Sequence, residues 1–158
     1  MALNVGDNAP NFTLPADDDT TVELAALRGK WVIVYFYPRD NTPGCTTEAC
    51  GFRDHHDDIV GSHNATVLGV RADSLKSHAR FRAKHDLPFL LLSDPEHGMM
   101  EAWGVWAEKK NYGRTYMGIV RSTFIIDPEG VVAAAWTKVR VKNHVDTVIA
   151  RLAELQAA

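Results

Sequence analysis

The stretch KWVIVYFYPRDNTPGCTTEACGF, residues 30–52, joins a predicted strand to a predicted helix and carries both cysteines of the chain. Residues 30–38 form an apolar, β-branched and aromatic run that ends at a proline, which is typical of a strand buried on both faces. Thr42 and Pro43 follow, and proline is favoured at the first position of a helix. We therefore expect a buried strand followed directly by a helix over 43–60.

Outside this stretch, apolar runs alternate with segments of helical spacing. Further strands are expected over 65–73 and 89–94, and two more within 121–136, joined by a type I turn at 127–130. Helices are expected over 74–86 with Ser74 as N-cap, over 95–103, and over 143–156. This alternation predicts an α/β fold with a central mixed β-sheet flanked by helices, and the closing hairpin and helix make it thioredoxin-like. Residues 11–30 could add a short N-terminal hairpin, and 108–114 is expected to be a solvated loop.

The length and composition set broad limits on function. The chain has 158 residues, which suits a single domain over 1–158, and it is 46% hydrophobic and 23% charged. Its net charge of −3 and the absence of a long basic run argue against nucleic acid or an anionic membrane as a main partner. No signal-peptide pattern or membrane-spanning apolar run is evident, so a cytoplasmic location is expected. In that compartment a close cysteine pair is more often catalytic, redox-active or metal-binding than a stable structural disulfide.

Cys45 is the better placed of the two cysteines for chemistry. If Pro43 is the first helical residue, Thr42 is the N-cap and Cys45 lies in the first turn. Free backbone N–H groups and the positive end of the helix dipole stabilise an anion there, and a thiolate is such an anion. The Thr42 hydroxyl could cap the helix or hydrogen-bond the sulfur or an incoming oxygen.

Other interpretations of the cysteines exist. A lone cysteine is most often a small buried hydrophobe. Cys45 and Cys50 could also be half of a metal site, but zinc sites commonly have tighter pairs, and no paired histidine pattern lies near them. A thioredoxin-type oxidoreductase would have two residues between its cysteines, whereas this chain has four. The proline-framed helix start and the second cysteine favour a reactive thiol.

At these residues the sequence resembles a known family. YPRDNTPGCTTEAC (37–50) is similar to the active-site stretch of peroxiredoxins of the bacterioferritin-comigratory-protein, or PrxQ, type. The family's proline, threonine and cysteine are matched by Pro38, Thr42 and Cys45, and the subfamily's second cysteine by Cys50. The resemblance extends over LLSDPEH (91–97), GVWAEKKNYGRTYMGIVRSTFIIDPEG (104–130) and NHVDTVI (143–149).

The resemblance implies a thioredoxin-dependent thiol peroxidase that acts on hydrogen peroxide and alkyl hydroperoxides without a metal, haem or flavin. Cys45 would be the peroxidatic cysteine, and Cys50 would resolve its sulfenic acid into an intramolecular disulfide that thioredoxin or a similar dithiol reduces. Arg121 matches the arginine that the family places beside the thiolate, where it would also bind the peroxide oxygens. Pro38 would shield the pocket from water. Independently of the resemblance, nothing in the sequence marks an obligate interface, so a monomer is expected.

The spacing of the cysteines raises a conformational question. On one regular helix, residues five apart have Cα atoms about 8.6 Å apart, whereas a disulfide needs less than about 7 Å. We therefore expect the start of the 43–60 helix to unwind after oxidation. Gly51 either weakens this helix or meets a packing requirement.

The remaining conspicuous residues carry plainer expectations. Glu48 is taken as a surface carboxylate, Tyr37 either lines the pocket or packs in the core, and the four tryptophans are expected in the core or at its rim. Two rival functions remain at this stage. One is a thiol–disulfide oxidoreductase that reduces proteins, and the other is a redox-sensing or chaperone-like protein whose disulfide signals rather than turns over.

Overall fold

The computed structural model describes residues 3–38, 43–111 and 113–157. Its centre is a five-stranded sheet in the order β5-β4-β3-β8-β9. The strands are β3 (Trp31–Phe36), β4 (Ala65–Arg71), β5 (Leu90–Ser93), β8 (Ser122–Ile126) and β9 (Val132–Trp136). β3, β4 and β5 run parallel, whereas β8 and β9 are antiparallel to their neighbours. The predicted mixed sheet is confirmed.

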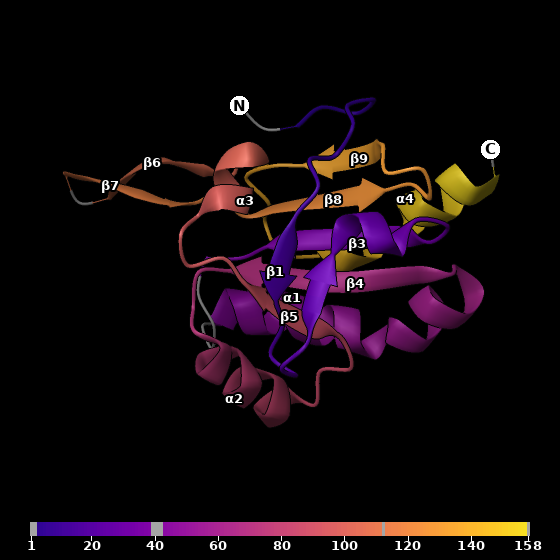
Figure 1. Ribbon diagram of the computed structural model, residues 1–158, viewed down its shortest axis with the longest axis horizontal. Coiled ribbons are helices and arrows are strands. Elements are labelled where there is room, and N and C mark those ends of the chain that lie inside the picture. The colour runs from indigo at the N-terminus through magenta and orange to yellow at the C-terminus, as the bar shows by residue number, and fades with distance from the viewer. Residues whose placement is uncertain (1–2, 39–42, 112, 158) are drawn as a thin grey trace.

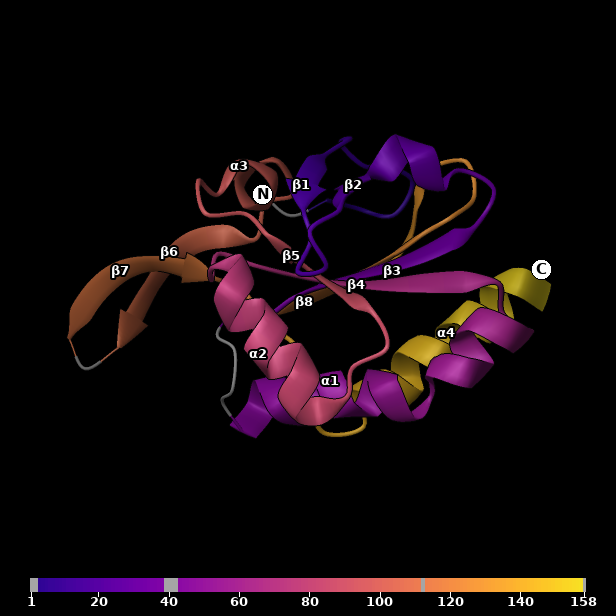
Figure 2. The same ribbon diagram turned by 60° about the horizontal axis from the view of Figure 1, so that its bottom comes forward.

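Helices and the N-terminal segment cover opposite faces of this sheet, as Figures 1 and 2 show. The helices α1 (Pro43–Asp54), α2 (Leu75–His85) and α4 (His144–Ala157) lie on one face. The hairpin β1 (Thr13–Pro15) and β2 (Thr21–Glu23), the short helix η1 (Leu24–Leu27) and α3 (Gly98–Ala102) lie on the other. The expected N-terminal hairpin is thus present. Ser74 caps α2 by accepting a hydrogen bond from the backbone N–H of Ser77 at 3.1 Å, also as expected.

The run of apolar residues in β3 divides between two hydrophobic cores. Val32, Val34 and Phe36 pack toward the N-terminal hairpin and α3. Ile33 and Tyr35, and Tyr37 directly after the strand, pack toward the helices. Successive side chains of a strand point to opposite faces, so a strand covered on both sides must be apolar at every position. Tyr37 is therefore a core residue, which decides between its two predicted places.

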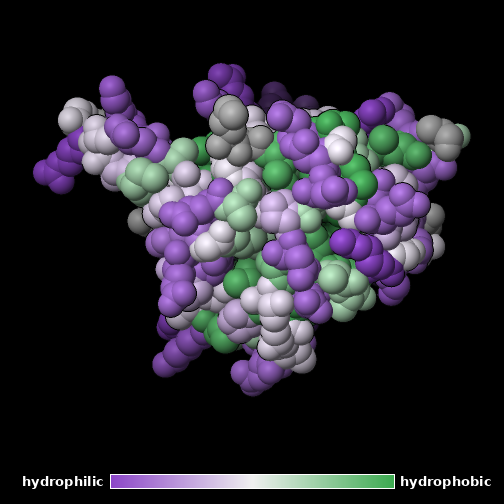
Figure 3. Space-filling view, turned by 45° about the horizontal axis from the view of Figure 1, so that its top comes forward, coloured by the Kyte–Doolittle hydropathy of each residue, from purple (hydrophilic) through white to green (hydrophobic). Residues whose placement is uncertain are grey.

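Two predictions about element boundaries were wrong. Helix α1 ends at Asp54 rather than at residue 60, and a separate π-helical turn, η2 (Asp58–Ser62), follows it. Residues 108–114, expected to be a loop, belong to the hairpin of β6 (Trp106–Asn111) and β7 (Arg114–Ile119). This two-stranded ribbon projects from the body (Figures 1 and 3), and β7 is mostly exposed. Its polar sequence reflects that exposure.

Candidate active site

The site forms at the edge of the sheet where parallel strands end. α1 begins shortly after β3, and its first residue is Pro43, as expected. This start places Cys45 in the first turn, 1% exposed, as a free thiol. Thr42, the predicted N-cap and hydroxyl donor, lies outside the described residues. The sulfur thus lies near the positive end of a helix of 12 residues, inside the protein.

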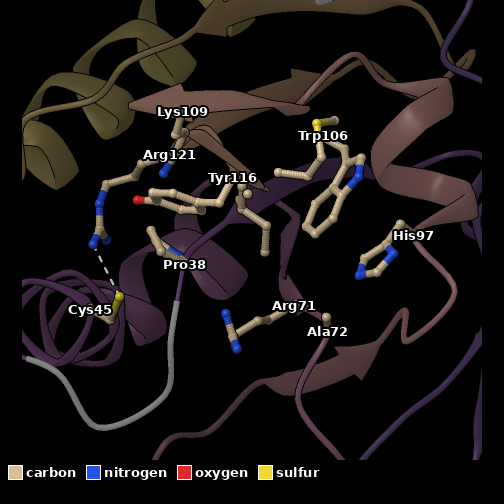
Figure 4. Close-up of a pocket in the computed structure, with 12 residues that line it drawn as sticks. Pro38, Cys45, Arg71, Ala72, His97, Trp106, Lys109, Tyr116 and Arg121 are labelled. Carbon is tan, nitrogen blue, oxygen red and sulfur yellow. Dashed lines mark hydrogen bonds between the residues drawn. The ribbon is translucent and has the colours of Figure 1, made fainter. Parts of the chain in front are cut away.

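Arg121 reaches the same edge from the far side of the sequence. It lies between β7 and β8, and β8 pairs antiparallel with β3 through Phe36 and Ser122. Its Nη2 donates a hydrogen bond to the sulfur of Cys45 at 3.0 Å, drawn as a dashed line in Figure 4. Burial lowers the pKa of Arg121, but the neighbouring Glu48 carboxylate and Cys45 sulfur outweigh this and raise it. The guanidinium therefore remains charged against the sulfur.

Glu48 is a functional residue that the sequence interpretation missed. It is 0% exposed, not a surface carboxylate, and its Oε1 accepts a hydrogen bond from Nη1 of Arg121 at 2.7 Å. Burial raises the pKa of Glu48 to about 7, against the lowering effect of Arg121. A signal was available, because Cys45, Glu48, Ala49 and Phe52 are the buried residues of α1 and recur at helical spacing. Glu48 fixes the arginine that contacts Cys45.

His144 continues this buried network at the start of α4. Its Nε2 lies 3.8 Å from Oε2 of Glu48 and 2.8 Å from the hydroxyl of Thr123 on β8. Burial lowers the pKa of His144 to about 4, and the nearby Arg121 charge adds to the effect. His144 is therefore a neutral imidazole near neutral pH. Hydrogen bonds thus link Cys45, Arg121 and Glu48, and His144 lies next to this chain without a hydrogen bond to Glu48.

A pocket of about 540 Å³ opens beside Cys45. Its described lining is Pro38, Cys45, Arg71, Ala72, His97, Trp106, Lys109, Tyr116, Met117, Gly118, Ile119 and Arg121. Figure 4 shows Cys45 and Arg121 at one end, with Pro38 beside them. Pro38 thus lines the pocket, and the β6–β7 hairpin supplies one wall. Of the tryptophans, Trp103 is fully buried, whereas Trp106 is partly buried and lines the pocket.

Cys50 lies on the same helix as Cys45, as expected. It is partly buried, and both cysteines are free. Five residues of regular helix separate their Cα atoms by about 8.6 Å, so this form holds the two thiols apart. Over the ranges that the structure covers, no three His, Cys, Asp or Glu side chains converge as metal ligands would. No described helix combines the length and apolar character that crossing a bilayer requires.

A buried thiol at a helix start, a guanidinium on its sulfur and a thioredoxin-like sheet define a cysteine-based redox enzyme. The chain belongs to the AhpC/TSA family, whose model matches residues 5–135. It is 48% identical over 155 residues to peroxiredoxin Bcp of Bacillus subtilis, with 98% of each chain covered. It is 43% identical over 152 residues to peroxiredoxin Bcp of Escherichia coli, with 96% of this chain and 97% of that one covered.

Solved structures agree with this assignment. The bacterioferritin comigratory protein of Xanthomonas campestris, whose alkyl peroxide reduction activity has been studied structurally, superposes with a TM-score of 0.88 at 40% identity, covering 96% of each chain. A cysteine-to-serine mutant of PrxQ from Xylella fastidiosa superposes with a TM-score of 0.90 at 38% identity, covering 99% of this chain and 98% of that one. The resemblance to Bcp and PrxQ peroxiredoxins is confirmed, as is the thioredoxin-like fold. The chain is a peroxiredoxin, an oxidoreductase of the peroxidase class.

Proposed function

We propose that this protein reduces hydrogen peroxide and alkyl hydroperoxides with Cys45 as the peroxidatic cysteine. The observation that carries the proposal is the 3.0 Å hydrogen bond from Arg121 to the buried Cys45 sulfur. A fixed cation next to a sulfur at a helix start stabilises the thiolate, which is the nucleophilic form. The same guanidinium has further N–H donors for a peroxide oxygen.

The first step is an attack of the Cys45 thiolate on one peroxide oxygen. The S–O bond forms as the O–O bond breaks, leaving a sulfenic acid on Cys45 and an alkoxide that takes a proton to leave as alcohol or, from hydrogen peroxide, as water. Negative charge moves from sulfur to the leaving oxygen during this step. Arg121 stabilises that charge because its position is set in advance by Glu48.

Cys50 is proposed as the resolving cysteine. Its thiolate attacks the sulfur of the Cys45 sulfenic acid, an S–S bond forms, and hydroxide leaves as water after protonation. Thioredoxin or a similar dithiol protein then reduces the disulfide by exchange and becomes oxidised itself. We propose that the chain does this as a monomer in a reducing compartment such as the cytoplasm, with no bound cofactor and without nucleic acid or membrane as a partner.

A coupled assay with thioredoxin, thioredoxin reductase and NADPH tests the proposal. We expect NADPH loss that depends on peroxide, and none for Cys45→Ser because a serine hydroxyl is scarcely ionised at neutral pH. Cys50→Ser should consume about one equivalent of peroxide in a single turnover and then stall. Equal loss of the first turnover in both variants would refute the two roles. Reduction of insulin instead of peroxide would favour the rival oxidoreductase, and stoichiometric oxidation without turnover the redox sensor.

A further inference from the structure

The pocket beside Cys45 is larger than hydrogen peroxide requires. Its volume of about 540 Å³ falls in the range of sites for small organic ligands, whereas a water molecule occupies about 30 Å³ of liquid. It extends from Cys45 and Arg121 to Trp106 and His97 at its far end (Figure 4). These far rings stack with centroids 3.7 Å apart and an interplanar angle of 14°. A substrate that filled this space would carry an organic group.

The wall that faces this space is largely apolar. It comes from the β6–β7 hairpin, which contributes Trp106, Tyr116, Met117 and Ile119. Tyr116 and Met117 are 47% and 52% exposed, which is unusual for large apolar side chains in this protein. An alkyl or aryl group that packed here would remove this apolar surface from water, which is favourable.

The charge of the described lining is positive. Arg71, Lys109 and Arg121 line the pocket, and none of the described lining residues is acidic, although the whole chain has a net charge of −3. Arg121 already contacts the sulfur of Cys45 and the carboxylate of Glu48. Figure 4 shows Lys109 beside Arg121, so Lys109 belongs to the reactive end. Arg71 is a cation of the lining that the proposed peroxide chemistry does not use.

The side chain of Arg71, the last residue of β4, is held in place by an ion pair. Its Nη2 pairs with Oδ1 of Asp73 at 2.5 Å, and its side chain is 16% exposed. Its Nε has no hydrogen-bond partner among the described residues. A guanidinium has five N–H donors in a fixed fork, so one ion pair leaves donors available, and little rotamer freedom remains to be lost on binding. Figure 4 shows Arg71 across the space from Tyr116, between the reactive end and the far rings.

We propose that this pocket selects organic hydroperoxides that carry a carboxylate, with the apolar part against the hairpin and the carboxylate on Arg71. The inference rests on the proposed function, because the hydroperoxide group reacts at Cys45 as described above. Arg71 takes no part in bond making or breaking. It increases the affinity of the pocket for carboxylated hydroperoxides and orients them toward Cys45, so it determines specificity.

A matched pair of substrates tests this assignment. Cumene hydroperoxide and its para-carboxylated and meta-carboxylated derivatives share one reacting group and one apolar body, and differ only in the charge and its position. We expect kcat/KM to be about tenfold higher for at least one carboxylated compound, which corresponds to about 1.4 kcal/mol. Arg71→Met should bring this ratio close to one, and kcat/KM for hydrogen peroxide should stay within about twofold of wild type.

Two further variants separate a subsite from general electrostatics. Lys110 is exposed on the same hairpin and does not line the pocket, so Lys110→Met should retain the preference. Arg71→Lys keeps the positive charge and should retain part of the preference for the carboxylated substrates. If Arg71→Met does not fold, inhibition of the wild type decides: the unreactive alcohol 4-(2-hydroxypropan-2-yl)benzoate should compete with hydrogen peroxide better than uncharged 2-phenyl-2-propanol.

The outcomes are distinct. A ratio near one for both carboxylated substrates in the wild type, or an unchanged preference in a folded Arg71→Met, would overturn the subsite while Cys45-dependent turnover of hydrogen peroxide continued. Equal inhibition by the two alcohols would also count against it. Loss of the proposed function would appear differently, as absence of any Cys45-dependent peroxide turnover.

Discussion

Glu48 and His144 place two titratable groups in the interior, with pKa values shifted in opposite directions. The pKa of Glu48 rises from 4.5 to about 7, and that of His144 falls from 6.5 to about 4. Each shift makes stability depend on pH. The folded protein holds the Glu48 proton more tightly than the unfolded chain. The contribution of this proton to the free energy of unfolding is therefore fully present below pH 4.5 and is lost as pH rises toward 7. The His144 contribution is present above 6.5 and is lost as pH falls toward 4.

The two slopes should therefore offset one another in the wild type between about pH 4.5 and 6.5. Glu48→Gln removes the contribution of Glu48, because glutamine does not titrate. Relative to this variant, the unfolding free energy of the wild type should fall by roughly 1 kcal/mol per pH unit as pH rises from 4.5 to 7. Relative to His144→Gln, it should instead rise between pH 4 and 6.5. Urea unfolding across this range measures both, and parallel pH curves for all three proteins would contradict the prediction.

The same residues show where sequence reasoning stops. The place of Cys45 at a helix start followed from local pattern, since the prolines that frame it are visible in the sequence, whereas the pocket role of Pro38 came from family resemblance. Glu48 was misjudged because an acidic side chain in a helix is exposed by default. Only its place on the stripe of Cys45, Ala49 and Phe52 indicated burial, and the partner that makes burial tolerable lies 73 residues away.

At the scale of elements, the packing of α1 on α4 explains Gly51. A Cβ built at this position would lie 2.8 Å from Cγ2 of Val145 on α4, closer than real contacts allow. Val145 is 7% exposed and β-branched, so it has little room to turn away. The glycine therefore meets a packing requirement, which favours one of its two predicted explanations. Glycine at this position still weakens the helix by about 1 kcal/mol relative to alanine, in addition to meeting the packing requirement.

Gly51→Ala should consequently destabilise the protein despite the better helix former. An overpacking cost of about 1–3 kcal/mol should exceed the propensity gain of about 1 kcal/mol, leaving a net loss near 1 kcal/mol. In a Val145→Ala background the same change should become stabilising, because the clash is gone. A double-mutant cycle by chemical denaturation measures this coupling. Gly61→Ala, in the helical turn η2 where a Cβ would meet nothing within 4 Å, is the control and should not destabilise the protein, because it can show the propensity gain of up to about 1 kcal/mol without a clash. Additive effects of Gly51→Ala and Val145→Ala would refute the clash.

The position of both cysteines on α1 leads to a second prediction at this scale. Because a regular helix keeps their Cα atoms about 8.6 Å apart, a Cys45–Cys50 disulfide requires part of Pro43–Asp54 to unwind. Amide hydrogen exchange should accelerate by about tenfold or more at the start of α1 in the oxidised protein. Strands β8 and β9 should keep their protection and serve as the internal reference. Unchanged exchange in α1 of a protein shown by mass spectrometry to carry this disulfide would rule unwinding out.

At the scale of the whole molecule, the site depends on sheet topology. Cys45 and Arg121 are 76 residues apart and meet because β8 lies against β3, from whose end α1 begins. The order of strands and helices could be predicted from apolar runs, and so could a mixed sheet. The sequence alone did not indicate that β6 and β7 are strands, because a ribbon that projects into water lacks the buried apolar alternation of a strand. The place of Arg121 came from family resemblance, not from its local sequence.

Arg121→Met tests this long-range assembly. It keeps much of the side-chain length but removes the charge beside the sulfur, so the second-order rate of Cys45 oxidation by hydrogen peroxide should fall by about 10²-fold or more. Single-turnover kinetics measure this step apart from reduction. Arg114→Met removes an exposed arginine from β7 and should leave the rate unchanged. A normal oxidation rate in Arg121→Met would take this residue out of the reaction.

The projecting hairpin has an evolutionary consequence. The thiol, its guanidinium and the buried carboxylate are tied into the sheet and its covering helices, where most changes would threaten folding. The opposite wall of the pocket stands on a ribbon whose strands pair only with each other among the described strands. Mutations there can accumulate with little penalty to the rest of the protein. Changes in this one short segment can therefore alter which apolar group the pocket accepts, whereas the reacting groups and Arg71 stay fixed by the central sheet and its helices.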